Sequence, residues 1–180
     1  ADALLPGFPW AQTLAAMVLI ARQSFEFARQ AAERGAAAQV AQDRAALAAN
    51  GLLWMRGLTA LARGARAEAL ADFRAEAALS GAGTSVYARE CSVIAHEALG
   101  FTHLSMGEDT AAREAFHAAA TASPGHGRAM LGLALADGPG ADPIGRVGPA
   151  AEAMRRVGKA GERSLLLAAA HGWAGRGSEG

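Results

Sequence analysis

Apolar residues recur at helical spacing along most of the chain, and glycines or prolines separate the apolar stretches. This pattern predicts helices over residues 9–34, 37–62, 65–79, 86–106, 109–122, 127–136, 149–159 and 164–173. We expect the first helix to end at Gly35, because glycine is the usual residue after a helix C-terminus. β-Branched residues are sparse and no segment indicates a strand. The sequence therefore predicts an all-α fold with about seven to nine helices.

Two central segments share one spacing of small and aromatic residues, and the second copy follows the first by 43 residues. The first contains Leu53, Gly57, Gly64, Ala69 and Phe73, and the second contains His96, Gly100, Gly107, Ala112 and Phe116. In each copy the first glycine is expected to let a neighbouring helix approach closely, and the second to close a turn. The alanine and the phenylalanine are i, i+4 and share a helix face.

This arrangement resembles the tetratricopeptide repeat family, whose motif is a helix–turn–helix of 34 residues. Segment 97–124, EALGFTHLSMGEDTAAREAFHAAATASP, matches the motif well, and segment 52–79 matches it moderately, because Arg56 and Glu76 replace apolar or small residues. A third copy starts at Met130, Leu133 and Ala134. The 43-residue spacing implies longer helices or an insertion around residues 80–88.

The resemblance implies an α-solenoid of antiparallel helical hairpins. Its repeat domain would cover residues 1–136, with the best repeats at 50–83 and 93–126. A Gly/Pro-rich loop is expected at 137–148. Helices within 149–173 are expected to pack on or cap the repeats, and 174–180 to form a flexible tail.

In this family the first helix of each repeat lines a concave groove that binds a partner. The positions that match this groove are Trp54, Leu58, Leu61, Glu97, Phe101, Ser105, Arg128 and Leu131. The set is mostly apolar and lacks the Lys, Arg and Asn cluster with which some members grip a C-terminal carboxylate. We therefore expect a helical or apolar protein ligand. That ligand would be a partner peptide, residues 149–173 of the chain itself, or a second copy.

The composition narrows the class of partner. The 180 residues carry 17 basic and 17 acidic side chains, so no net charge favours nucleic acid or an anionic membrane. The most apolar run, residues 14–21, is much shorter than the roughly 20 residues of a spanning helix. The single cysteine, Cys91, allows no intrachain disulfide, which fits a reducing compartment and a cytoplasmic location. The bias toward Ala, Gly and Arg is typical of GC-rich bacteria.

Candidate chemistry is sparse. His96 and His103 lie seven residues apart and could share a metal with His117, but they occupy packing positions of the repeat. Cys91 is expected to be a buried neutral thiol. The glycines of 132–148 do not form a phosphate-binding motif. Arg155, Arg156, Lys159 and Arg163 favour a solvated helix face.

No catalytic residue, metal site or cofactor is therefore predicted, and an enzyme is the least supported function. The favoured function is a protein-interaction scaffold. The alternative is a regulatory or sensor segment of a larger bacterial signalling or transcription-regulating protein, which the absence of an initial methionine slightly favours.

Overall fold

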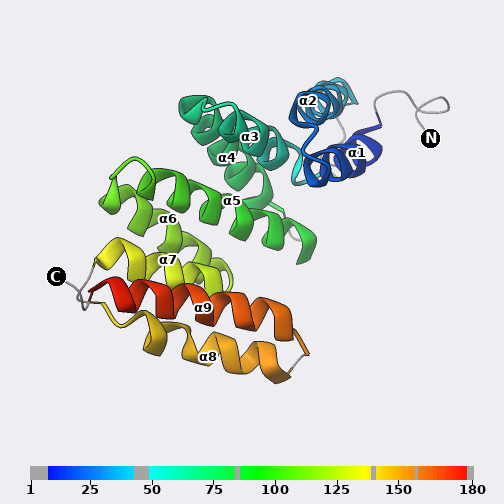
Figure 1. Cartoon of the computed structure of the whole chain (residues 1–180). Coiled ribbons are helices and arrows are strands. Elements are labelled where there is room, and N and C mark those ends of the chain that lie inside the picture. Colours follow the sequence, from blue (N-terminus) through cyan, green and yellow to red (C-terminus); the bar gives the residue numbers. More distant parts are fainter. Residues whose placement is uncertain (1–7, 43–48, 84–85, 139–140, 157, 178–180) are drawn as a thin grey trace. The chain divides into compact units, whose positions relative to one another are not determined.

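The computed structural model describes residues 8–42, 49–83, 86–138, 141–156 and 158–177. Within these ranges the chain forms nine α-helices and no strand, which confirms the all-α prediction (Figure 1). Their bounds are α1 Pro9–Ala21, α2 Phe25–Gln42, α3 Leu52–Ala62, α4 Arg66–Gly81, α5 Val86–Leu104, α6 Asp109–Ala122, α7 Gly127–Asp137, α8 Pro143–Arg156 and α9 Ala160–Gly177. The chain divides into two compact units, Ala1–Ala95 and His96–Gly180, and α5 passes from the first to the second.

Helices in the first unit pack mainly against their neighbours in sequence. Helix α3 contacts α1, α2 and α4, and α1 also packs along α2. The core between α1, α2 and α3 is built largely from alanines, with Ala16, Ala31 and Ala32 fully buried beside Met55. Because alanine adds little volume, these helices lie close together and bury little apolar surface for each residue.

The first two helices differ from the prediction of 9–34 and 37–62. The break lies at Arg22–Ser24, where Gln23 adopts a φ of 57° and the Ser24 N–H donates to the Leu19 carbonyl at 2.8 Å. Gly35 instead lies inside α2, where a Cβ would come within 2.9 Å of the Leu52 side chain. The glycine serves close packing and not termination. The predicted second helix, 37–62, is interrupted at residues 49–51, which form a turn before α3, while 43–48 lie outside the described residues.

The two predicted hairpins close with the same turn. Gly64 and Gly107 have φ angles of +77° and +74°. In the first turn the Ala65 N–H donates to the Ala60 carbonyl at 2.9 Å, and in the second the Glu108 N–H donates to the His103 carbonyl at 3.0 Å. Both bonds reach back five residues, and glycine tolerates the left-handed conformation that they require. The predicted role of the turn glycines is confirmed.

A phenylalanine ring lies against a glycine of the preceding helix in each hairpin. A Cβ on Gly57 would lie 2.4 Å from the Phe73 ring, and one on Gly100 would lie 2.6 Å from the Phe116 ring. Gly132 on α7 approaches the same Phe116 ring, at 2.3 Å for an added Cβ. Both rings are fully buried. The predicted close approach at the first glycine of each copy is confirmed.

The 43-residue spacing has its cause in the length of α5. Helix α3 begins at Leu52, whose counterpart in the second copy is Ala95, yet α5 begins nine residues earlier, at Val86. Of the two alternatives from the sequence, a longer helix is therefore the one observed. Helix α4 also continues to Gly81, two residues beyond its predicted end at 79.

The second unit packs α6, α8 and α9 against α7, and α8 lies along α9 (Figure 1). One of its cores contains Leu131, Val147, Ala150, Leu166 and Ala170. Two predicted boundaries were wrong. Residues 143–148 are not loop but the start of α8, because the Asp142 carboxylate accepts the Gly145 N–H at 2.9 Å and Pro143 occupies the first turn. Residues 174–177 are not tail but the end of α9, while 178–180 lie outside the described residues.

Glu76 is fully buried and holds the start of α3. Its carboxylate accepts the N–H groups of Gly51 at 2.8 Å and Leu53 at 3.1 Å. It also accepts the Ser80 hydroxyl, which in turn accepts an N–H of Asn50 at 3.0 Å. The carboxylate thus satisfies helix N-terminal amides that have no partner within the helix and lies at the positive end of its dipole. This contact explains why a charged residue is fully buried here.

Replacing the packed glycines by alanine should lower stability. Gly57→Ala and Gly100→Ala would gain about 1 kcal/mol from helix propensity, but the Cβ overlaps a buried ring and should cost about 1–3 kcal/mol. Gly172→Ala in α9, with no neighbour within 4 Å, should be stabilising and serves as control. Urea unfolding measures the free energy of unfolding of the three variants. A gain at Gly57 as large as that at Gly172 would show that the ring contact does not constrain the hairpin.

Removing the Glu76 carboxylate should also destabilise the first unit. Glu76→Ala leaves the amides of Gly51 and Leu53 and the Ser80 O–H without their acceptor, at an expected cost of about 2–3 kcal/mol in unfolding free energy. Glu68→Ala on the same helix removes only an exposed pair with Arg63 and should cost less than about 1 kcal/mol. Equal losses from the two substitutions in urea unfolding would contradict the capping role of Glu76.

Candidate partner-binding surface

The three predicted groove residues of the first unit are Trp54, Leu58 and Leu61, and all lie half-buried on α3. Trp54 packs on the cluster of Ala16, Ala31, Ala32 and Met55. Part of its ring is therefore used in the core between α1, α2 and α3, and only the remainder is open to a ligand.

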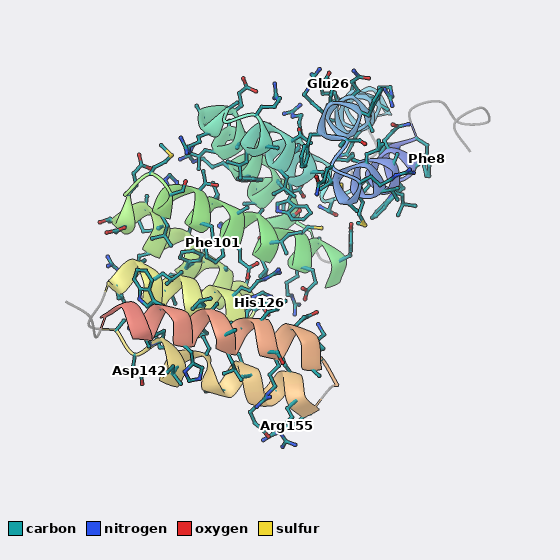
Figure 2. All side chains as sticks on the ribbon, viewed as in Figure 1. Phe8, Glu26, Phe101, His126, Asp142 and Arg155 are labelled. Carbon is teal, nitrogen blue, oxygen red and sulfur yellow. The ribbon has the colours of Figure 1, made fainter. Side chains whose placement is uncertain are left out.

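The five predicted residues of the second unit have different environments. Glu97 and Leu131 are buried, while Ser105 and Arg128 are exposed. Phe101 is 36% exposed, and the edge of its ring meets Phe116 with centroids 4.9 Å apart (Figure 2). The structure brings Glu97 and Arg128 together and places Leu131 in a separate cleft. A single groove along all eight residues stays a prediction.

Glu97 is the centre of a small charged cluster. Its carboxylate lies 2.6 Å from His126 Nδ1 and 3.1 Å from Arg128 Nε. His126 directly precedes α7 (Figure 2), so the buried carboxylate also lies beside the positive end of that helix dipole. The Glu97 side chain is only 6% exposed, whereas that of Arg128 is 60% exposed. The cluster thus ties α5 to α7 and leaves most of Arg128 in solvent.

An apolar cleft of about 350 Å³ lies between α7 and α9. It is lined by Leu131, Leu135, Ala168, Ala169, Gly172 and Trp173. On α9 the exposed Leu165 precedes Ala168 by one helical turn, so 165, 168, 169 and 172 form one stripe at i, i+3, i+4 and i+7. Leu165 is 74% exposed. We call this surface the α7–α9 cleft.

Only Leu131 of the α7–α9 cleft was among the residues predicted from the sequence. The apolar spacing along 165–172 indicates the α9 residues that line the cleft. A stripe of this kind, however, usually marks the buried face of a helix. In the structure Leu166 and Ala170 are buried instead, and the stripe beside them faces solvent. The outward direction of the stripe could not be derived from its spacing.

A second cleft, of about 270 Å³, lies between α2, α3 and α4 and has charged walls. Its cations are paired with carboxylates: Arg29 with Glu33, Arg56 with Asp72 and Arg63 with Glu68. The hydrogen bonds that Arg56 donates to the Asp72 carboxylate raise the pKa of Arg56. With each cation matched by an anion, this cleft offers no net charge to an anionic ligand, and its ion pairs connect the three helices.

The histidines and basic residues take part in local contacts. His103 is buried, and its Nδ1 lies 2.5 Å from Glu108, which agrees with a structural role. Burial lowers the pKa of His96. In the described ranges no three His, Cys, Asp or Glu side chains gather as a metal site. In the predicted basic face, Arg155 (Figure 2) and Arg156 pair with Glu152 and Lys159 pairs with Glu162, all largely exposed.

Acidic Asp137 joins three helices of the second unit. It lies at the end of α7 and pairs with Arg113 of α6 and Arg146 of α8, at 2.7 and 2.6 Å. The hydrogen bond from Arg113, followed by that from Arg146, lowers the pKa of the carboxyl. A carboxylate is unfavourable at a helix C-terminus, and the two guanidinium groups offset that repulsion.

Cys91 is buried in the first unit, as predicted, beside Tyr87 and Gly51. Burial raises the pKa of its thiol to about 11, and the nearby Glu76 carboxylate adds to this effect. The thiol is therefore protonated at neutral pH, which is the opposite of what a cysteine nucleophile needs.

None of the helices in the described ranges combines the length and apolar character needed to cross a bilayer.

No protein-family model matches the chain, and a search of curated proteins finds no significant match. The likeness to a known family therefore rests on the repeat residues themselves. What the sequence and the structure establish together is an all-α protein whose helices pack mostly against their sequence neighbours as hairpins.

Cys91 should resist thiol reagents in the folded protein. A rise in pKa from its ordinary value of 9.0 to about 11 lowers the thiolate fraction near pH 8 about a hundredfold. Labelling with a chromogenic disulfide reagent should therefore be at least about a hundredfold slower than in the urea-unfolded chain. Rapid labelling of the native protein would show that the thiol is accessible and ionised.

Proposed function

We propose that this protein is a tetratricopeptide-like interaction module whose α7–α9 cleft receives the apolar side of a short helix from a protein partner. The observation that carries the proposal is the apolar lining of this cleft together with the exposed Leu165 beside it. Apolar grooves between helices bind amphipathic helices through side chains at i, i+3, i+4 and i+7.

The residues of the cleft suit close contact with a helix. Ala168, Ala169 and Gly172 are the small residues of the lining, so that a ligand backbone can approach α9 closely. Trp173 and Leu135 are among its large apolar residues. Aromatic residues at the edge of such a cleft are frequent centres of binding energy.

Arg128 indicates how the proposed ligand is oriented on the cleft. It lies one helical turn before Leu131 on α7, and its side chain is 60% exposed although its Nε faces Glu97. An acidic residue on the ligand would form an ion pair with the outer nitrogens of this guanidinium. The favoured ligand is therefore an amphipathic helix with an apolar stripe and an acidic residue at one end.

Filling the cleft should abolish binding without unfolding the protein. Gly172 has no neighbour within 4 Å of an added Cβ, so Gly172→Leu occupies the cleft and also favours helix. The ligand would be selected from displayed peptides of roughly 15 residues, about four helical turns. Fluorescence anisotropy should show at least about tenfold weaker binding to Gly172→Leu.

Gly161→Leu is the matched control, because Gly161 also lies on α9 without a close neighbour and is not part of the cleft. It should bind the selected peptide like the unchanged protein. The proposal fails if no helical peptide is selected, or if both leucine variants bind equally well. Circular dichroism confirms that each variant keeps its helical content.

A further inference from the structure

Helix α1 buries two polar residues and exposes three large apolar residues. Gln12 and Thr13 are buried, whereas Leu14, Met17 and Val18 are 62%, 48% and 56% exposed. The three exposed residues are spaced i, i+3 and i+4 and so lie on one stripe, which we call the α1 stripe. A surface helix normally shows the reverse arrangement.

The α1 stripe also has no charge around it on its own helix. No residue of Pro9–Ala21 carries a charged side chain. A helix that is apolar on both its inner and outer sides is typical of a helix covered on both sides. The stripe therefore has the character of a contact surface.

We infer that the α1 stripe pairs with the α1 stripe of a second copy of this chain, in an antiparallel two-fold contact. The inference concerns a surface of the first unit and is independent of the α7–α9 cleft. A two-fold contact places a surface against itself, so any charge within it would meet the same charge. An uncharged stripe avoids this repulsion entirely.

The charge that follows α1 in the chain agrees with antiparallel pairing. Arg22, exposed, follows the last residue of α1. In an antiparallel pair the two Arg22 residues lie at opposite ends of helices that are about 20 Å long, a separation beyond the Debye length of about 8 Å. They would not repel strongly. Parallel pairing would place them together.

A lipid surface suits the α1 stripe less well. Interfacial helices carry several Lys or Arg residues beside their apolar face. Here the cation that follows on α2, Arg29, is already bound by Glu26 and Glu33 at 2.5 and 2.6 Å. Among the described residues from Pro9 to Arg29, the other cation is Arg22, at the end of the stripe, which gives an anionic bilayer little to attract.

The two-fold contact has a definite register. A two-fold axis near the middle of the stripe sets Leu14 of one copy against Val18 of the other and brings Met17 near its own counterpart. Methionine adapts its shape readily at such a contact. Three large side chains from each copy make a small interface, so the expected dissociation constant is on the order of tens of micromolar.

Sedimentation equilibrium over a concentration series tests the pairing. The unchanged protein should form dimers, and Leu14→Glu and Val18→Glu should each weaken the dimer at least about tenfold. Since both side chains are already exposed, the monomer should keep its helicity by circular dichroism. Val40→Glu, on α2 in the same unit and 83% exposed, is the matched control and should dimerise normally.

The register is tested by oxidation. With copper phenanthroline as the oxidant, Met17→Cys should give an intermolecular disulfide, whereas Val40→Cys should not, and the buried Cys91 is common to both. The inference is overturned if the unchanged protein is monomeric at about ten times the expected dissociation constant. It is also overturned if Val40→Glu dissociates the dimer as well as Leu14→Glu. Gly172→Leu should leave the dimer intact. A failure of the proposed peptide binding can therefore be distinguished from a failure of the proposed dimer contact.

Discussion

The contact of a phenylalanine ring with a glycine backbone determines how closely the helices of this protein lie. Phe73 takes the space left by Gly57, and Phe116 takes the space left by Gly100 and Gly132. Because the glycines have no side chain, the rings pack directly on helix backbone, and their burial supplies apolar area that an alanine-rich core otherwise lacks. The turn glycines 64 and 107 then return the chain so that each ring meets its glycine.

Polar contacts complete the hairpins where small side chains leave backbone groups without partners. Glu76 binds the amides at the start of α3, and Glu97 lies beside the start of α7. In both cases a buried carboxylate from a neighbouring helix meets the positive end of a helix dipole. Glu76 accepts backbone amides of α3, whereas Glu97 contacts the side chains of His126 and Arg128, so the two carboxylates stabilise the starts of α3 and α7 through different partners.

An alanine-rich chain also has few large apolar side chains, so the places where they face solvent are informative. In the first unit three of them, Leu14, Met17 and Val18, form the α1 stripe, and in the second Leu165 lies beside the α7–α9 cleft. Exposure of such residues costs free energy in water and is tolerated at surfaces that contact another protein. The proposed peptide site and the proposed dimer contact both rest on this reasoning, and each uses a different unit.

Local sequence accounts for the helical class, for the glycines that pack against phenylalanine rings and for the glycines that close the turns. Helical periodicity, the matched spacing of Gly57 and Gly100, and the turn glycines depend on neighbours close in the chain, and all agree with the structure. The break at Gln23 was missed, because a non-glycine residue in the left-handed conformation has no local signature. Which side of α1 and α9 faces solvent was decided only by tertiary packing, since periodicity shows that a helix has a stripe but not what covers it.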